Sequence, residues 1–120
     1  MKNTEINTRI AEHFDYLYDL TERFSDSRYW DDDAIEEAAE KMGAGIDETI
    51  EIMKVVCDAS IYANAAAVKS ADTGAAALAS SIRDRRHLDD GQTNAIYNDI
   101  WNAIHTGAYR ELVKLLAKAE

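Results

Sequence analysis

Apolar residues recur along the chain at intervals of three and four, which is the period of an amphipathic helix. The first such stripe predicts a helix from about Thr4 to Phe24, with one buried face. Its members are Ile6, Ile10, Phe14, Leu17, Leu20 and Phe24. A second stripe follows Trp30 and ends at Gly43, a residue suited to the left-handed turn that stops a helix. Its members are Ile35, Ala38, Ala39 and Met42.

The middle of the chain predicts a long helix that starts at Asp47 as its N-cap and extends to about Ala71. Apolar residues cover most of its circumference: Ile50, Ile52, Met53, Val55, Val56, Cys57, Ile61, Ala63, Ala67 and Val68. A helix that is apolar nearly all round is buried by neighbours on several sides, so we expect this to be the central helix. The residues expected in its core are Ile50, Met53, Val56, Cys57 and Ile61. Truncation of Ile61 to alanine is then expected to cost about 2–5 kcal/mol.

Three shorter helices are predicted in the rest of the chain. One runs from about Gly74 to His87; the next follows the turn Asp89-Asp90-Gly91 and closes at Thr106-Gly107; the last packs Leu112, Leu115 and Leu116. The chain of 120 residues contains no proline and five glycines, the two residues that helix interiors exclude. The predicted fold is all-α: a compact bundle of about six helices around a long central helix, with residues 1–120 as a single helical domain.

Residues that could carry chemistry are few. The three histidines, His13, His87 and His105, lie far apart in sequence, and no HExxH, paired-cysteine or Glu-x-x-His pattern occurs. Cys57 lies on an apolar helix face, where a structural thiol is expected rather than a nucleophile. The sequence therefore predicts no metal, no cofactor and no catalytic residue, although composition leaves open an enzyme that uses carboxylates between helices.

The net charge of −10 is unevenly distributed. Residues 1–58 contain 16 acidic and 6 basic residues, whereas residues 59–120 contain 7 of each. An acidic protein repels nucleic acid and anionic membranes, so direct binding to either is not expected. The single cysteine, the polar N-terminus and the lack of a long apolar run predict a cytoplasmic protein.

Two other patterns point away from DNA binding. The segment from Ala34 to Val56 superficially resembles a helix-turn-helix, but its second helix would begin with acidic residues that repel phosphates. Arg83, Arg85 and Arg86 form the one basic cluster. Because Asp84 lies among these arginines, we interpret the cluster as a mixed, salt-bridged surface.

Acidic residues form a second stripe on the first predicted helix, away from its apolar face: Glu12, Asp15, Asp19, Glu22 and Asp26. The second predicted helix adds Asp31, Asp32, Asp33, Glu36, Glu37 and Glu40. Tyr16, Tyr29 and Trp30 lie near these acids in sequence, and such aromatics are typical anchors of interfaces. Two interpretations remain open: a solvated face that keeps the protein soluble, or a surface that binds a basic partner.

In size, charge and lack of motifs, the chain resembles the small acidic proteins of phages and mobile elements that inhibit nucleic-acid-handling machinery, including anti-CRISPR proteins and DNA mimics. The resemblance implies a non-enzymatic inhibitor or regulator whose acidic helical face binds a basic, nucleic-acid-handling protein. It carries over no individual residues. The alternative is a helical regulatory or antitoxin-like homodimer that acts through apolar helix faces.

Overall fold

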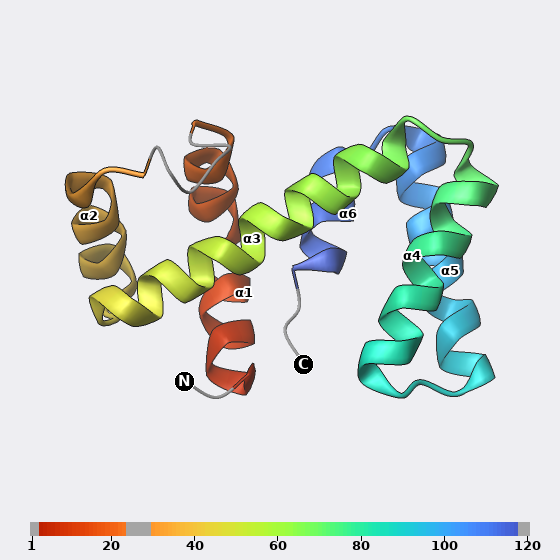
Figure 1. Ribbon diagram of the computed structural model, residues 1–120, viewed down its shortest axis with the longest axis horizontal. Helices are drawn as coiled ribbons and strands as arrows, with labels where there is room; N and C mark the ends of the chain where they lie inside the picture. Colours follow the sequence, from red (N-terminus) through yellow and green to blue (C-terminus); the bar gives the residue numbers. More distant parts are fainter. Residues whose placement is uncertain (1–2, 24–29, 118–120) are drawn as a thin grey trace. The chain divides into compact units, whose positions relative to one another are not determined.

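The computed structural model describes residues 3–23 and 30–117, and these form six helices without a strand (Figure 1). The helices are α1 (Asn3–Arg23), α2 (Asp32–Met42), α3 (Ile46–Ala67), α4 (Ala71–Arg86), α5 (Asp90–Thr106) and α6 (Tyr109–Leu116). The predicted all-α fold is confirmed.

Local side chains set several helix ends as the sequence predicts. The carboxylate of Asp31 accepts a hydrogen bond of 2.7 Å from the backbone N–H of Ala34 and so caps α2. Asp89 and Gln92 form a reciprocal capping box at the start of α5. Gly43 and Gly107 adopt the left-handed conformation, with φ of 64° and 71°, and end α2 and α5.

Several helix boundaries differ from the prediction, and α5 begins at Asp90, within the predicted turn. The N-cap assigned to Asp47 is wrong, because α3 already begins at Ile46 and the preceding Gly45 carbonyl accepts hydrogen bonds from the N–H and hydroxyl of Thr49. Asp47 instead adds favourable charge to the first turn.

Another difference is the end of α3 and the start of α4. Helix α3 ends at Ala67 rather than Ala71, and α4 starts at Ala71 rather than Gly74. The reason is Ser70, whose hydroxyl accepts from the N–H of Thr73 at 3.2 Å and caps α4. Gly74 therefore lies buried inside a helix.

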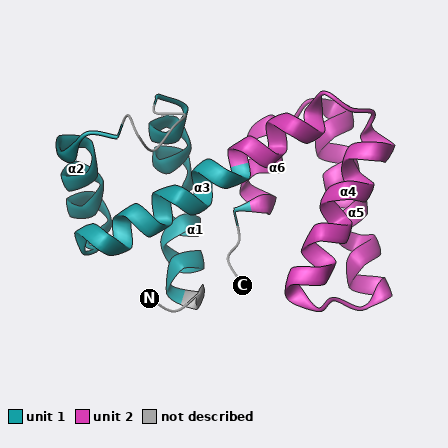
Figure 2. Ribbon diagram, in the orientation of Figure 1, with its two compact units in different colours: residues 1–59, 117–119 teal, residues 60–116, 120 magenta. Residues whose placement is uncertain are grey.

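The chain divides into two compact units, and the boundary falls within α3 (Figure 2). Residues 1–59 and 117–119 form unit 1, which contains α1, α2 and the first part of α3. Among its core side chains Leu17, Ile52, Met53 and Val56 have no exposed surface. The apolar stripes of the sequence thus meet in this core.

Unit 2 comprises residues 60–116 and residue 120, and its largest interface joins α4 and α5. Its core includes Ile82, Ile100 and Leu112. Side-chain hydrogen bonds add long-range ties: the Trp101 indole N–H donates to the carboxylate of Asp72 at 2.7 Å. The hydroxyl of Tyr109 donates to the backbone carbonyl of Ser60 at 3.2 Å.

The predicted core of the long helix is confirmed only in part. Met53, Val56 and Cys57 are buried, but Ile50 is half-buried and Ile61 is 53% exposed. Beyond residue 58, the buried positions of α3 are the alanines Ala59, Ala63 and Ala66. Small side chains allow neighbouring helices to pack closely, and so the bulky residues of this part of α3 face outward.

Candidate functional site

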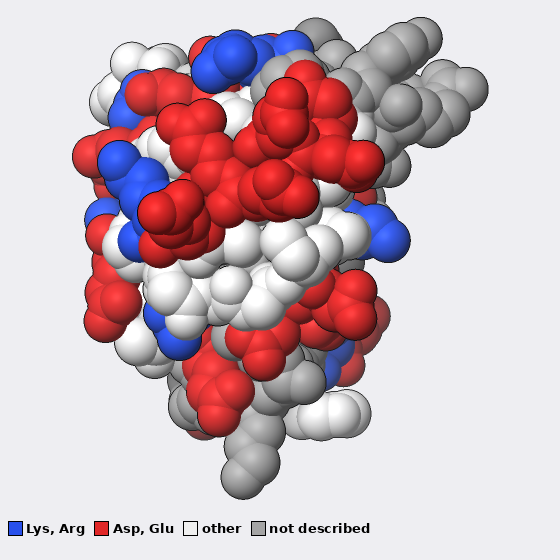
Figure 3. Space-filling model, turned by 90° about the vertical axis from the view of Figure 1, so that its left-hand side faces the viewer, with Lys and Arg blue, Asp and Glu red and all other residues white. Residues whose placement is uncertain are grey.

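The candidate site is the acidic surface of α1 and α2, which we define by its described members: Glu12, Asp15, Asp19, Glu22, Asp31, Asp32, Asp33, Glu36, Glu37 and Glu40. All ten side chains are exposed. Figure 3, which views the molecule from the side of α2, shows acidic side chains crowded over this face. Trp30 is half-buried directly before the N-cap of α2. The two other predicted members, Asp26 and Tyr29, lie outside the described residues.

Contacts between α1 and α2 bring the two acidic stripes together. The guanidinium of Arg9 donates to the backbone carbonyl of Met42 at the end of α2. Farther along α1, the ring of Tyr16 lies under the ammonium of Lys41, whose Nζ is 4.6 Å from the ring centroid. In Figure 1, α1 runs upward from the N-terminus and α2 runs downward toward α3, so the two helices point in opposite directions. This arrangement places the exposed acidic stripe of α1 beside the exposed acidic stripe of α2.

Tyr16 marks the point where the two stripes meet. On α1 it lies four residues after Glu12 and three before Asp19, so these three side chains share one face. Desolvation by partial burial raises the pKa of the Tyr16 phenol, and the negative charge of Glu37 on α2 raises it further, while Arg23 lowers it. The influence of Glu37 shows that a carboxylate of α2 is electrostatically close to the acidic face of α1.

The raised pKa of Tyr16 predicts a pH effect. A group with a raised pKa in the folded state contributes stability below its unfolded pKa and loses that contribution as pH rises through the folded pKa. We expect the protein to lose stability in strong alkali, and Tyr16→Phe to remove part of that loss. Ultraviolet titration of tyrosinate should show a late-ionising component that is smaller in Tyr16→Phe.

A second variant isolates the electrostatic contribution to this shift. In Glu37→Gln the same tyrosine should ionise at lower pH than in the wild type, because the neighbouring negative charge is gone. Glu51→Gln, which neutralises an exposed acid on α3, serves as the control. An unchanged titration in Glu37→Gln would contradict the proximity of the two stripes.

Helix α1 contains a kink that the sequence did not reveal. His13 has φ of −123° and ψ of 21°, outside the helical range, and its Nε2 lies 3.8 Å from an Oε2 of Glu12. The kink falls between Glu12 and Asp15 and so changes the direction of the acidic stripe. No proline or glycine lies near this position, so no familiar sequence signal marks it.

The other chemical candidates stay separate in space. Among the described residues, no three histidine, cysteine, aspartate or glutamate side chains are grouped so that they could hold a metal ion. His105 stacks on Trp101 with ring centroids 4.6 Å apart, and His87 ends α4 in the left-handed conformation. Cys57 is a buried thiol.

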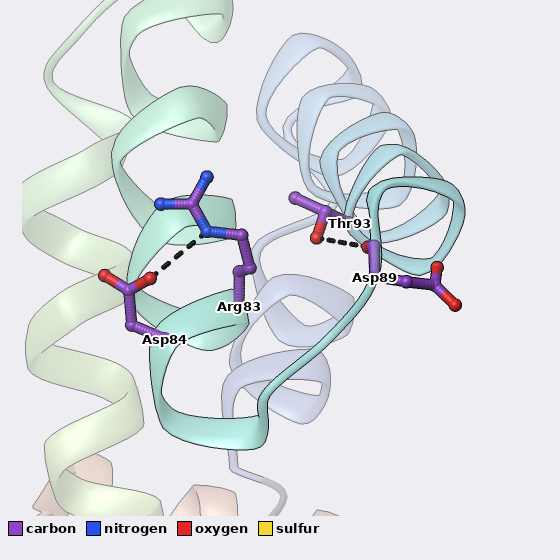
Figure 4. A network of polar contacts seen from close by, with 4 residues as sticks. All are labelled: Arg83, Asp84, Asp89 and Thr93. Carbon is purple, nitrogen blue, oxygen red and sulfur yellow. Dashed lines mark hydrogen bonds and ion pairs between the residues drawn. The ribbon is translucent and has the colours of Figure 1, made fainter.

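The arginine-rich end of α4 matches the predicted mixed surface. Nε of Arg83 lies 3.1 Å from a carboxylate oxygen of Asp84 (Figure 4). The same view includes the start of α5, where the Thr93 hydroxyl donates to the backbone carbonyl of Asp89 at 2.7 Å. Both contacts are exposed and local: the first joins neighbouring residues of α4, and the second lies at the start of α5.

Comparisons of the chain with protein-family models, with curated proteins and with solved structures found no match. The described helices include none with both the length and the apolar character needed to cross a membrane. Fold and surface together define the class: an all-α protein whose net negative charge lies in its first half.

Proposed function

We propose that the protein is a non-enzymatic binding protein that presents the acidic surface of α1 and α2 to a basic surface on a partner protein. The partner's basic surface is one that binds DNA or RNA, so the protein acts as an inhibitor or regulator of a nucleic-acid-handling protein. The observation that carries the proposal is the exposure of ten carboxylates on two adjacent antiparallel helices. Among the described residues of α1 and α2, three cations offset them: Arg9, Arg23 and Lys41, of which Arg9 and Lys41 lie at contacts between the helices.

Folding does not require this arrangement. Acids one helical turn apart repel each other by a few tenths of a kcal/mol per pair. Within the described part of the chain, Glu22, Asp32, Asp33, Glu36 and Glu40 have no ion-pair partner. A surface that maintains such repulsion is suited to a partner that supplies the missing positive charge.

The spacing of the acids suits a partner surface that normally binds phosphates. Residues one turn apart on a helix are separated by about 5 Å along its axis. Phosphates on one DNA strand follow each other at about 3.4 Å of rise, and by a longer distance through space. Two acidic helices side by side can therefore offer a basic groove a density of negative charge comparable to that of nucleic acid.

The aromatic residues add a less salt-sensitive part to the contact. Tyr16, where the two acidic stripes meet, and Trp30, directly before the N-cap of α2, are both half-buried. Aromatic anchors of this kind bury apolar area at an interface, while the surrounding charges mainly accelerate the encounter. We therefore expect the acids to determine the association rate and Trp30 to influence the dissociation rate.

The test is a charge-reversal variant in which Asp15, Asp19 and Glu22 are all changed to lysine. A pull-down from the native host identifies the partner, and association kinetics are then measured with purified proteins at several salt concentrations. The variant should associate at least about tenfold more slowly and with a smaller dependence on salt, because it loses electrostatic steering.

The matched control reverses Asp90, Asp99 and Glu111, three exposed acids of the second half. It has the same total charge as the first variant but leaves the acidic surface intact, so its association rate should stay near that of the wild type. Thermal melts should show that both variants fold. Equal binding by all three proteins, or binding unaffected by 1 M salt, where the Debye length is about 3 Å, would leave the acidic surface with solubility as its role.

A further inference from the structure

Unit 2 contains a small recess to which three helices contribute side chains. Its volume is about 110 Å³, and all of its lining residues belong to this unit. The lining consists of Tyr62 of α3, four residues of α4, namely Leu78, Ser81, Ile82 and Arg85, and Leu116 of α6. The four residues of α4 follow the spacing i, i+3, i+4 and i+7, so one face of this helix forms most of the recess.

The floor of the recess is apolar. Ile82 and Leu116 are buried, and Leu78 is half-buried. An apolar cavity of about 150 Å³ accommodates benzene, so this smaller recess suits a branched chain of about four carbons. Such a group would bury its hydrocarbon surface against these three side chains, which favours binding through the hydrophobic effect.

The rim of the recess is polar and has unused hydrogen-bonding capacity. Tyr62, Ser81 and Arg85 are exposed, and none of the three has a hydrogen-bond or ion-pair partner within the described part of the chain. Arg83, two residues earlier, differs in this respect, because its Nε pairs with Asp84 at 3.1 Å. The rim therefore offers a guanidinium and two hydroxyls as donors to a ligand.

The charge of the lining indicates what kind of anion fits. The described residues that line the recess include one cation, Arg85, and no acid. One guanidinium balances a single negative charge, and its planar fork matches a carboxylate with two parallel hydrogen bonds. Leu78 and Arg85 lie at the two ends of the α4 face, so a ligand meets hydrocarbon at one end and positive charge at the other.

We propose that this recess binds a small monocarboxylic acid with a branched aliphatic body of about four carbons. The aliphatic body occupies the floor formed by Leu78, Ile82 and Leu116. The carboxylate accepts hydrogen bonds from Arg85 at the rim, with the hydroxyls of Tyr62 and Ser81 as further donors. None of these residues belongs to the acidic surface, so the proposal does not depend on the partner-binding function proposed above.

An NMR titration of the isotope-labelled full chain with isovalerate tests the proposal. Backbone signals of the lining residues should shift saturably, with a dissociation constant in the millimolar range because few ligand atoms make contact. Acetate has the charge without the aliphatic body, and isovaleramide has the body without the charge. Each should bind at least about fivefold more weakly than isovalerate. Absence of a saturable shift up to about 50 mM isovalerate, or equal binding of the amide, would overturn the proposal.

A pair of arginine variants tests the role of the cation. Arg85→Gln should weaken isovalerate binding by about fivefold or more, because the carboxylate loses its charged donor. The matched control is Arg83→Gln, which removes the same charge from an arginine outside the lining, and its binding should stay near that of the wild type. Equal weakening by the two substitutions would show that isovalerate senses only the net charge, which contradicts a site at Arg85.

A pair of serine variants tests the position of the ligand. Ser81→Leu should fill the recess and abolish isovalerate binding. Ser80→Leu makes the same change at the preceding residue, which is exposed and does not line the recess, and should bind as the wild type does. Both serines are exposed on α4, so circular dichroism should show both variants folded. Binding retained in Ser81→Leu, or lost equally in both variants, would overturn the proposed site.

Discussion

Truncation of Ile52 to alanine should lower the free energy of unfolding by about 2–5 kcal/mol, the usual range for a cavity in a packed core. Ile52 has no exposed surface and lies in the core of unit 1. The same truncation at Ile61, on the same helix, should cost less than about 1 kcal/mol, because a side chain that is 53% exposed leaves little cavity. Urea denaturation followed by circular dichroism measures both values.

This pair of variants compares one side-chain type in two environments. Equal losses at the two positions would contradict the assignment of Ile61 to the surface.

Substitution of Gly74 by alanine should lower the free energy of unfolding by about 1–2 kcal/mol, although alanine is the better helix former by about 1 kcal/mol. A Cβ at this position would lie 2.8 Å from the backbone oxygen of Ala66 and 3.0 Å from Cδ1 of Ile104. The Ile104 side chain can rotate, but the Ala66 carbonyl belongs to the helix backbone of α3. The extra methyl group must therefore push α3 and α4 apart.

Gly45→Ala provides the control for this substitution. An added Cβ at Gly45 would meet no atom within 4 Å, and its φ is not positive. Its stability should change by less than about 0.5 kcal/mol. Thermal melts of the two variants measure the difference, and stabilisation by Gly74→Ala would show that the close approach of α3 and α4 at Ala66 is not maintained in solution.

Much of the candidate site could be read from the sequence, because it depends on local spacing. Acids at intervals of three and four must share one side of a helix, and charged side chains away from an apolar stripe face water. The meeting of the two stripes at Tyr16 was not predictable, since it depends on the antiparallel pairing of α1 and α2. The kink at His13 lacks a sequence signal as well.

The surface of α3 shows where apolar composition misleads. The sequence predicts Ile61 and Val68 in one helix with apolar residues on most of its circumference, and this pattern predicts burial on all sides. In the structure Ala59, Ala63 and Ala66 face inward, whereas Ile61, Tyr62 and Val68 face water. A periodic pattern identifies which residues share a face of a helix. The packing of the neighbouring helices decides which of those faces is covered.

The sequence by itself therefore determined the helices, most of their caps and the location of the charge, because these depend on residues within one or two turns of each other. The tertiary structure decided which side of α3 is buried, that Gly74 packs closely against Ala66 and Ile104, and how the acids of α1 and α2 combine. Those features depend on contacts between residues far apart in the chain, such as Gly74 with Ile104 and Tyr16 with Lys41. Local periodicity contains no information about these distances.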